Sequence, residues 1–391
     1  MKNNPLKQLT ALGQSIWLDY IRRDLIAGGG LQRLIEEDGL RGMTSNPAIF
    51  EKAIADSADY DADIRAMAFE GQAPGAIYET ISQRDVQGAA DAFRPLYDLT
   101  DGKDGYVSLE VNPHLAHDTH GTIVEARRLW TALNRPNVFI KVPATAEGLP
   151  AIQQLISEGI SVNVTLLFGL PRYRQVAEAY LGGIEARAAQ GQPVNRIASV
   201  ASLFVSRIDA LVDPLLEKRM ADGGHAAELA KKARGQVAIA SAKLAYQIYK
   251  EIFTSDRFKR LAAQGAGVQR LLWASTSTKN PDYSDVKYVE ALIGPDTVNT
   301  VPLETLEAYR DHGAPKVRLE QHLAQARQVL AQLPELGIRL DDVSQQLEDQ
   351  GVAKFNQPFD QLMATLAQRS ARRPESDAGQ SKPKIAKSAK D

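Results

Sequence analysis

The sequence of 391 residues contains no cysteine, which excludes disulfide bonds, a cysteine nucleophile and cysteine-ligated metal sites. An excess of one charge is also lacking, because 46 Lys and Arg residues stand against 48 Asp and Glu residues, for a net charge of -2. A chain without a basic field gives nucleic-acid binding no electrostatic support. We therefore expect no nucleic-acid partner.

Long hydrophobic runs are missing as well. No apolar stretch approaches the roughly 18 residues that a membrane-spanning helix needs, and residues 1–20 lack the apolar core of a signal peptide. The remaining composition, 44% hydrophobic and 24% charged residues, is ordinary for a soluble globular protein. The sequence therefore predicts a cytoplasmic protein without a membrane partner.

Short β-rich runs alternate with longer amphipathic stretches through most of the chain. Strands are expected at residues 15–20, 39–47, 106–111, 137–144, 161–168, 195–204, 270–277 and 297–302. Most of the gaps between these eight strands have helical periodicity. Alternation repeated eight times favours an α/β fold of the parallel (β/α)8 barrel type. A doubly wound open sheet stays the alternative, because alternation alone does not close a barrel.

Residues 1–369 are expected to form a single barrel domain with extra helices after the eighth strand. Helical patterns are expected at residues 224–264, 315–333 and 338–368, the last interrupted near Pro358. From residue 370 the composition becomes small, polar and Lys-rich, which predicts a disordered tail over residues 370–391. We interpret this tail as a solubilising end, with a weak electrostatic tether as the alternative.

Side chains alternate along a strand, so one face of each barrel strand points to the helices and the other to the interior. The faces assigned to the helices are aliphatic. The inward faces become polar towards the C-terminal ends of the strands, where they carry Asp19, Glu110, Lys141, Asn163, Thr165, Ser202 and Phe204. In the seventh strand the alternate residues Trp273, Ser275 and Ser277 are expected to lie on the same face, and Lys279 continues this alternation. The active sites of barrel enzymes lie at this end of the strands.

Buried polar groups cost free energy unless they are paired. A lysine on an inward face beside carboxylates indicates Schiff-base chemistry, because burial disfavours its ammonium form and frees an amine to attack a ketone. Asp19 and Glu110 can move the protons of such a reaction, and Arg207 and Lys279 can bind a phosphate. The alternative is a buried ion-pair network that only holds the barrel together.

At these residues the sequence resembles the transaldolase family, the transfer enzymes of the non-oxidative pentose phosphate pathway. The matching segments occur in family order and read WLDYIRRD, GMTSNPAIF, VSLEVNPHLA, FIKVPATAEG, SVNVTLLF, VASLFVSRID and WASTSTKNP. The segment GVAKFNQPFDQLMATL near the C-terminus also matches. The chain is similar to the longer subgroup of the family. It has no room for the glucose-6-phosphate isomerase domain that is fused to some long relatives.

The resemblance implies a barrel of the class I aldolase type and a transferase that needs neither a metal nor an organic cofactor. The enzyme would pass a dihydroxyacetone unit from sedoheptulose 7-phosphate or fructose 6-phosphate to glyceraldehyde 3-phosphate or erythrose 4-phosphate. Lys141 matches the Schiff-base lysine, and Asp19 matches the base for the hydroxyl on the fourth carbon of the donor. Glu110 and Thr165 match the pair that handles a water during imine formation and hydrolysis. Family members include monomers and homodimers.

Substrate-binding positions are implied by the same matches. Asn46, Asn163 and Ser202 match residues that hold the three-carbon unit, and Phe204 matches an aromatic residue lining the site. Arg207 matches a phosphate ligand. Ser277 and Lys279 lie at the second phosphate position, where many relatives have arginine. Lysine there keeps the charge but loses bidentate geometry.

Other hypotheses stay open beside this one. The histidines of NPHLAHDTH, which are His114, His117 and His120, would suit a zinc site, although a lysine site already explains the chemistry. An aldolase that releases free dihydroxyacetone would use the same residues. A catalytically silent barrel that serves in binding or regulation is the third hypothesis.

Overall fold

The structure is a computed structural model and describes residues 4–371 of the chain. In this part eight parallel strands form a closed barrel, in which each strand pairs with the next and the eighth with the first. They are β1 (Gln14–Asp19), β2 (Gly42–Thr44), β3 (Tyr106–Glu110), β4 (Val138–Pro143), β5 (Val162–Leu167), β6 (Ser199–Phe204), β7 (Gln269–Ala274) and β8 (Thr297–Val301). The predicted (β/α)8 barrel is confirmed, and the open-sheet alternative is excluded by the β1–β8 pairing.

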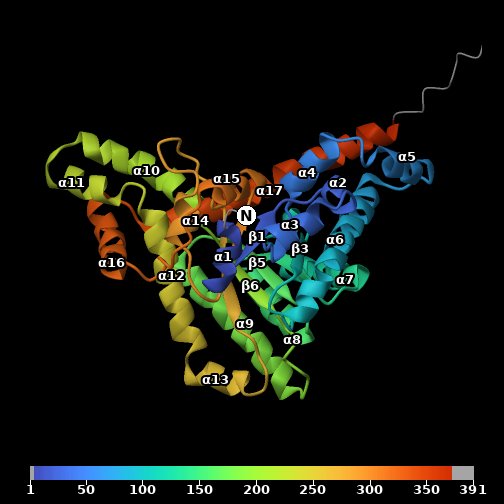
Figure 1. Cartoon of the computed structure of the whole chain (residues 1–391), viewed down its shortest axis with the longest axis horizontal. Helices are drawn as coiled ribbons and strands as arrows, with labels where there is room; N and C mark the ends of the chain where they lie inside the picture. Colours follow the sequence, from blue (N-terminus) through green and yellow to red (C-terminus); the bar gives the residue numbers. More distant parts are fainter. Residues whose placement is uncertain (1–3, 372–391) are drawn as a thin grey trace, which may run out of the picture.

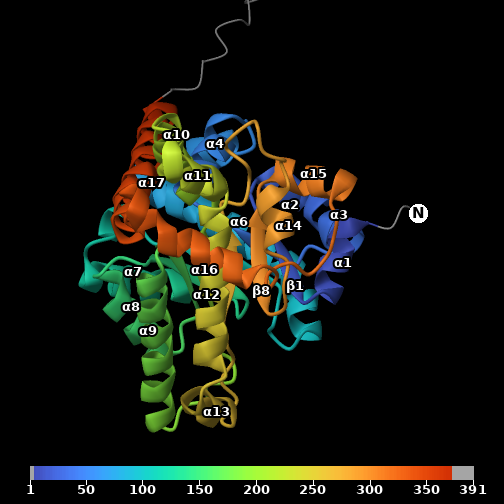
Figure 2. The same cartoon turned by 90° about the vertical axis from the view of Figure 1, so that its left-hand side faces the viewer.

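Helices surround the barrel (Figures 1 and 2). The first half of the chain contributes α1 (Pro5–Ala11), α2 (Arg23–Ala27), α3 (Gly30–Glu37), α4 (Pro47–Ala55), α5 (Asp61–Phe69), α6 (Pro74–Leu99), η1 (Pro113–Leu115), α7 (Thr119–Leu133), α8 (Gly148–Glu158) and α9 (Leu170–Ala189). The second half contributes α10 (Ser206–Ala221), α11 (Gly224–Ala233), α12 (Val237–Phe253), α13 (Asp256–Ala262), α14 (Lys287–Ala291), α15 (Leu303–His312), α16 (Leu323–Gln332), η2 (Leu333–Leu336) and α17 (Leu340–Ala371). Within residues 4–371, none of the helices has the length and apolar character that a membrane crossing requires.

The barrel interior is divided into an aromatic floor and a polar upper part. Trp17, Tyr106 and Phe139 stack in the floor, with ring centroids 4.2 Å apart for Tyr106 and Phe139 and 6.1 Å apart for Trp17 and Phe139. Gly42 is needed beside them, because a Cβ atom there would lie 2.5 Å from the indole of Trp17. Packing of this kind closes the N-terminal end of the barrel and leaves the C-terminal ends of the strands to hold polar side chains.

The C-terminal helix α17 lies against the end of β5. The backbone of Leu166 has a positive φ of 54°, and the β5–β6 register shifts between Val164 and Leu167. Gly351 of α17 sits over this irregularity, where a Cβ atom would be 2.9 Å from Cδ2 of Leu166. At the far end of the helix, Arg369 bonds to Asp61 of α5 and to the backbone oxygen of Ala55. The helix is therefore fixed at Gly351 and near its C-terminal end, and Figure 1 shows it beside α4.

Three sequence-based expectations differ from the structure. The helical region predicted over 224–264 is divided into α11, α12 and α13, and the pattern over 315–333 becomes helical only at Leu323. The interruption predicted near Pro358 is wrong, because α17 runs through this residue. A proline removes one helical hydrogen bond, but α17 packs along its length on α4, α5, α6 and η1. Most of the predicted tail, residues 372–391, lies outside the described residues.

The parity predicted for the seventh strand is also wrong at Trp273. The residues of β7 that join the interior aromatic cluster are Leu272 and Ala274, whereas Trp273 packs in the core between barrel and helices. Its indole nitrogen donates to the backbone oxygen of Leu292 there. The strand ends at Ala274, and Ser275 has a positive φ of 53°. This turn breaks the alternation, and it allows residues after Trp273 to reach the cavity described next.

Candidate active site

A cavity of about 250 Å³ lies where the strands end. Most of the residues predicted for the site line it, namely Asp19, Asn46, Lys141, Thr165, Ser202, Phe204, Arg207, Ser277 and Lys279. Residues that the sequence reasoning did not single out also line it, including Thr44, Thr300, Glu304, Lys354 and Phe355. Glu110 and Asn163 are the two predicted residues that do not line this cavity. They contact lining residues instead.

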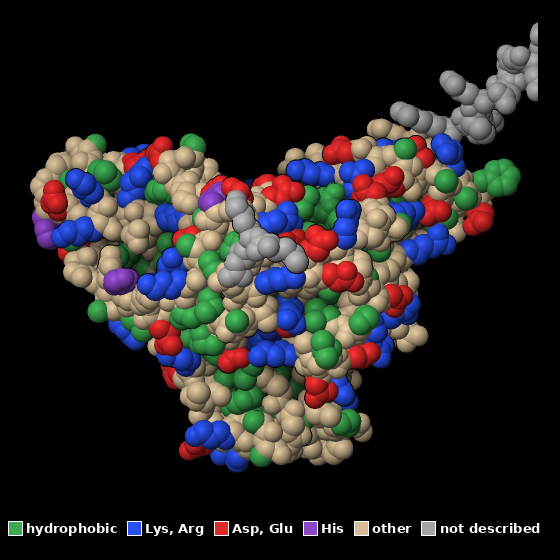
Figure 3. Space-filling view, viewed as in Figure 1, with side chains coloured by type: hydrophobic (Ala, Val, Ile, Leu, Met, Phe, Trp, Pro, Cys, Tyr) green, Lys and Arg blue, Asp and Glu red, His purple; other side chains and the backbone are tan. Residues whose placement is uncertain are grey.

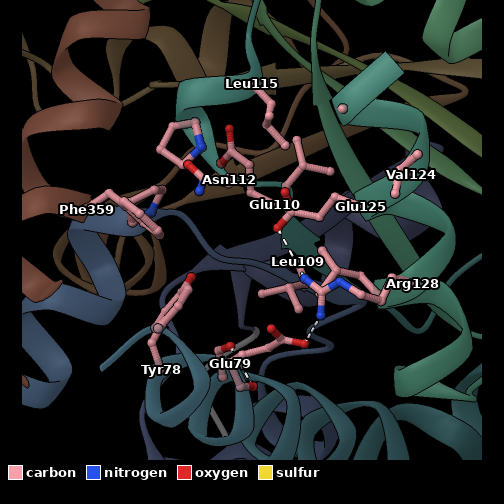
Figure 4. A pocket seen from close by; sticks show the side chains of 17 residues that line it. Tyr78, Glu79, Leu109, Glu110, Asn112, Leu115, Val124, Glu125, Arg128 and Phe359 are labelled. Atoms are coloured by element: carbon pink, nitrogen blue, oxygen red, sulfur yellow. Dashed lines mark hydrogen bonds and ion pairs between the residues drawn. The ribbon is translucent and has the colours of Figure 1, made fainter. Parts of the chain in front are cut away.

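A larger cavity, of about 340 Å³, lies outside the barrel wall among α6, α7 and α17 (Figure 4). The charged side chains of α6 and α7 in its wall pair with one another, since Arg128 forms an ion pair with Glu79 and lies 3.6 Å from Glu125. Tyr78 and Phe359 supply an aromatic wall, with ring centroids 5.6 Å apart. Glu110 is the one predicted site residue at its boundary. The cavity at the strand ends, which holds the lysine, is therefore the candidate active site.

Lys141 is placed by the register of three neighbouring strands. Glu110 of β3 pairs with Lys141 of β4, which in turn pairs with Asn163 of β5. The ammonium nitrogen lies 3.2 Å from Oε2 of Glu110 and donates to the backbone oxygen of Ser45 at 3.1 Å. The ring centroid of Phe355 lies 5.4 Å from the same nitrogen. The lysine is thus held among a carboxylate, a carbonyl oxygen and an aromatic ring, and it is shielded from solvent.

The carboxyl group of Glu110 is tuned for proton transfer near neutral pH. Burial raises the pKa of Glu110 to about 7, and the neighbouring Lys141 ammonium opposes part of this rise. A group whose pKa lies near the working pH is well suited to act both as acid and as base. Thr165 belongs to β5, the strand that pairs with the strand of Lys141, and it is fully buried. Its hydroxyl has no hydrogen-bond partner within residues 4–371.

Asp19 is held by a pair of threonines on the neighbouring strands. The hydroxyl of Thr44 donates to Oδ1 of Asp19 at 2.7 Å and lies 2.7 Å from the hydroxyl of Thr300. Burial raises the pKa of Asp19, whereas Lys141 and the Thr44 hydrogen bond lower it, and the carboxylate of Glu304 raises it again. The sequence reasoning did not single out either threonine. Their polar side chains in GMTSNP (Thr44) and TVNTVP (Thr300) could have indicated them.

Asn163 acts on the cavity through its neighbours. Its amide nitrogen donates to Ser108 at 3.0 Å, and its side-chain oxygen accepts from the hydroxyl of Ser202 at 2.7 Å. Asn163 is fully buried, so it orients Ser202, which does line the cavity. Asn46 caps α4 by accepting a hydrogen bond from the backbone nitrogen of Ile49 at 3.0 Å, which leaves its amide nitrogen for a ligand.

Basic side chains gather on one side of the cavity. Arg207 lies in the first turn of α10, and Lys279 follows β7 with Ser277, whose hydroxyl accepts from the Lys279 ammonium at 2.6 Å. Burial lowers the pKa of Lys279, and the charge of Arg207 lowers it further. The predicted phosphate ligands therefore come together, although they are 72 positions apart in the sequence.

A buried carboxylate pair joins the two segments that carry Arg207 and Lys279. Asp209 of α10 accepts from the hydroxyl of Tyr288 at 2.9 Å and from the backbone nitrogen of Ala238 at 2.7 Å. Asp213 accepts from the hydroxyl of Tyr283 at 2.7 Å and from the backbone nitrogen of Gly235 at 2.8 Å. These bonds tie α10 to the start of α12 and to the segment between β7 and α14.

The histidines of the alternative zinc hypothesis lie apart from this cavity. His114 lies 2.7 Å from a carboxylate oxygen of Asp360, and His117 lies 3.1 Å from one of Glu147. Residues 4–371 contain no group of three or more side chains placed to hold a metal ion. The zinc hypothesis therefore finds no ligand set in this part of the chain.

Comparisons with known proteins show which family the chain is similar to. A family model described as Transaldolase/Fructose-6-phosphate aldolase matches residues 16–366. A protein named Transaldolase from Trichodesmium erythraeum is 50% identical over 374 residues, covering 94% of this chain and 98% of that protein. Transaldolase 2 of Nostoc sp. is 49% identical over 371 residues, covering 94% and 97%. A Transaldolase of Saccharopolyspora erythraea is 48% identical over 367 residues, covering 93% and 97%. The likeness thus includes both the barrel and most of α17.

Proposed function

The chain belongs to the transaldolase and fructose-6-phosphate aldolase family and works as a transferase of the transaldolase type, and we propose that Lys141 is its nucleophile. The observation that carries this proposal is the buried contact of 3.2 Å between the Lys141 ammonium and Glu110 at the strand ends. A neutral amine is required for attack, and Glu110 is the nearest group that can accept the ammonium proton.

The first half of the reaction cleaves the donor, a ketose phosphate such as sedoheptulose 7-phosphate or fructose 6-phosphate. The amine of Lys141 attacks the ketone carbon, and the resulting carbinolamine loses water to become an iminium. Glu110 supplies the proton that makes the hydroxyl leave as water, and the free hydroxyl of Thr165 holds that water. The iminium then withdraws electrons from the neighbouring carbon–carbon bond.

Asp19 performs the proton transfer of the cleavage step. Its carboxylate takes the proton from the hydroxyl on the fourth carbon, the bond between the third and fourth carbons breaks, and an aldose phosphate leaves. The electron pair stays on the three-carbon unit as an enamine of Lys141. We assign the binding of the hydroxyl groups of that unit to Asn46 and Ser202, which line the cavity, while Asn163 accepts the hydrogen bond of Ser202.

The second half reverses these steps on an acceptor aldose phosphate, erythrose 4-phosphate or glyceraldehyde 3-phosphate. The enamine carbon attacks the acceptor's carbonyl, and Asp19 returns its proton to the new hydroxyl. Water then hydrolyses the iminium with Glu110 as base. Arg207, Ser277 and Lys279 bind the phosphate of either partner, while Phe204 and Phe355 limit the access of water.

A coupled assay tests the reaction. Fructose 6-phosphate is supplied with and without erythrose 4-phosphate, and glyceraldehyde 3-phosphate is followed. Release that requires the acceptor supports transfer. Equal release without acceptor would indicate an aldolase that frees dihydroxyacetone. No release from folded protein in either tube would contradict the proposal and favour a binding protein.

Two further properties follow from the same assignment. Sugar phosphates of the pentose phosphate pathway are the proposed substrates, and the cytoplasm is the proposed location. The proposed assembly is a monomer or a homodimer, which light scattering on the purified chain distinguishes.

A further inference from the structure

Lys354 is a basic residue of the cavity that comes from the C-terminal helix. It lines the cavity together with Arg207 and Lys279, which belong to α10 and to the segment after β7. Its neighbour Phe355 contacts the reactive end, with its ring centroid 5.4 Å from the Lys141 nitrogen. Two successive residues of α17 therefore reach both the lysine and the basic side of one cavity.

No acidic partner of the three basic side chains is found in the described part of the chain. Within residues 4–371, no carboxylate lies within ion-pair distance, 4.0 Å, of Arg207, Lys279 or Lys354. Elsewhere on the described chain most arginines are paired, as Arg23 is with Asp63 and Asp85. The one other acidic group on the cavity wall besides Asp19 is Glu304, which affects Lys279 only from beyond that distance.

The positive charge of Arg207 acts on both lysines of the cavity. The pKa of Lys354 is lowered first by burial and then by the charge of Arg207, as is the pKa of Lys279. Like charges brought together without counterions cost free energy. An arrangement of this kind is expected where an anion is bound, because the anion removes both the repulsion and the need for separate partners.

The packing of α17 on the barrel positions Lys354 near the cavity. Gly351 lets the helix lie against Leu166 and Phe168, whose atoms would be 2.9 Å and 3.6 Å from a Cβ atom at position 351. Lys354 follows Gly351 by three residues, so it points from nearly the same face of the helix. The close approach at Gly351 therefore carries Lys354 down to the cavity mouth.

We propose that Lys354 is a third cation of the phosphate site, and that α17 completes this site by adding Lys354 to Arg207 and Lys279. The proposal rests on the proposed function, because it assigns a further ligand to the sugar phosphate. A phosphate dianion has three terminal oxygens, and Arg207 offers a planar fork for two of them. The lysines are flexible point charges, and their ammonium groups are left to bind the remaining oxygen.

The test is the substitution Lys354→Gln, which keeps the length of the side chain and removes its charge. With fructose 6-phosphate we expect KM to rise about tenfold, the loss typical of one charged hydrogen bond, with kcat within about threefold of the parent. With unphosphorylated fructose as donor, KM is expected to stay unchanged. Inorganic phosphate as a competitive inhibitor is expected to bind about tenfold more weakly to the variant.

Two further variants separate charge from structure. Lys354→Arg is expected to restore most of the affinity for fructose 6-phosphate, because it retains the positive charge. Lys218→Gln, an exposed position of α10 outside the cavity, makes the same change of net charge and is expected to leave all constants unchanged.

The outcomes distinguish this inference from the proposed function. An equal rise of KM for fructose and fructose 6-phosphate in Lys354→Gln, or an unchanged affinity for inorganic phosphate, would overturn the role of Lys354. An inactive parent protein would instead contradict the proposed function. Active parent protein with parental constants in Lys354→Gln would overturn only the inference about Lys354.

Discussion

The carboxylate of Glu110 lies 3.2 Å from the ammonium nitrogen of Lys141, and both side chains are almost fully shielded from solvent. The pairing of β3 with β4 places the two residues side by side. A buried ion pair gains little stability, because the desolvation of two charges offsets their attraction. We therefore attribute the pair to the proposed reaction, in which Glu110 accepts the proton of the Lys141 ammonium.

Replacing the lysine should remove the chemistry but keep the fold. In Lys141→Ala we expect no measurable turnover and no borohydride-stable adduct with fructose 6-phosphate, because the other lysines on the described wall of the cavity, Lys279 and Lys354, form no ion pair with Glu110. Mass spectrometry of the intact protein measures the adduct, and circular dichroism checks the fold. Turnover or trapping that survives this change would rule out Lys141 as the nucleophile.

Glu110 should be required for the water-handling steps. In Glu110→Gln, which keeps the shape but cannot transfer a proton, we expect kcat to fall by roughly 10²- to 10⁴-fold, the typical contribution of a general acid or base. Since burial raises the pKa of Glu110 to about 7, the pH profile of kcat/KM of the parent should contain an ionisation near pH 7. That ionisation should be missing from the profile of the variant, and its persistence there would assign it to another group.

The eightfold alternation of strand-like and helical stretches predicted the barrel, but the sequence alone left an open sheet as the alternative. The alternation of aliphatic and polar residues within β1, β3, β4 and β5 indicated the end of the strands at which the site lies. In β7 the last residues are apolar on both faces, with Leu272 and Trp273 adjacent, so alternation could not decide which residue faces inward. The assignment of Trp273 was wrong for this reason. The roles assigned to the individual site residues stay predictions.

Two residues of the cavity wall, Lys354 and Phe355, show a second limit of prediction from the sequence. Lys354 and Phe355 lie more than 200 positions after Lys141, and the periodicity of α17 identifies only its apolar face. Which turn of the helix meets the cavity depends on the tertiary contact between Gly351 and Leu166. No local pattern reports such a contact. The segment GVAKFNQPFD carried a family resemblance, but its residues could be given a role only after the helix was placed.

Glu304 should shift the acidic limit of activity through Asp19, whose pKa is raised mainly by burial. Asp19 must be ionised to act as base, so activity falls as the pH drops through its raised pKa. Glu304 contributes to that rise. In Glu304→Gln we expect a lower pKa for Asp19, and the acidic limb of the kcat profile should shift to lower pH. Glu307→Gln, a change on the exposed side of the same helix, is the control and should leave the limb in place. A shift to higher pH in Glu304→Gln would contradict this assignment.

The hydroxyl of Tyr283 should matter for phosphate binding although it does not line the cavity. Tyr283→Phe removes the bond to the buried carboxylate of Asp213 but keeps the ring, whose centroid lies 3.4 Å from the Lys287 ammonium. The loss of a hydrogen bond to a buried charge costs roughly 1–3 kcal/mol of stability, which urea unfolding measures. Because Tyr283 anchors the segment that carries Lys279, we also expect a several-fold rise in KM for fructose 6-phosphate but not for fructose.

A matched control separates this positioning effect from general destabilisation. Tyr180 of α9 also donates its hydroxyl at 2.7 Å, to the backbone oxygen of Gly267 near the start of β7 and away from the cavity. Tyr180→Phe should therefore lower the stability without changing either KM. If Tyr283→Phe likewise changes only the stability, the carboxylate pair on α10 supports the fold but does not position Lys279, and the geometry of the phosphate site must be maintained by Arg207 and α17 alone.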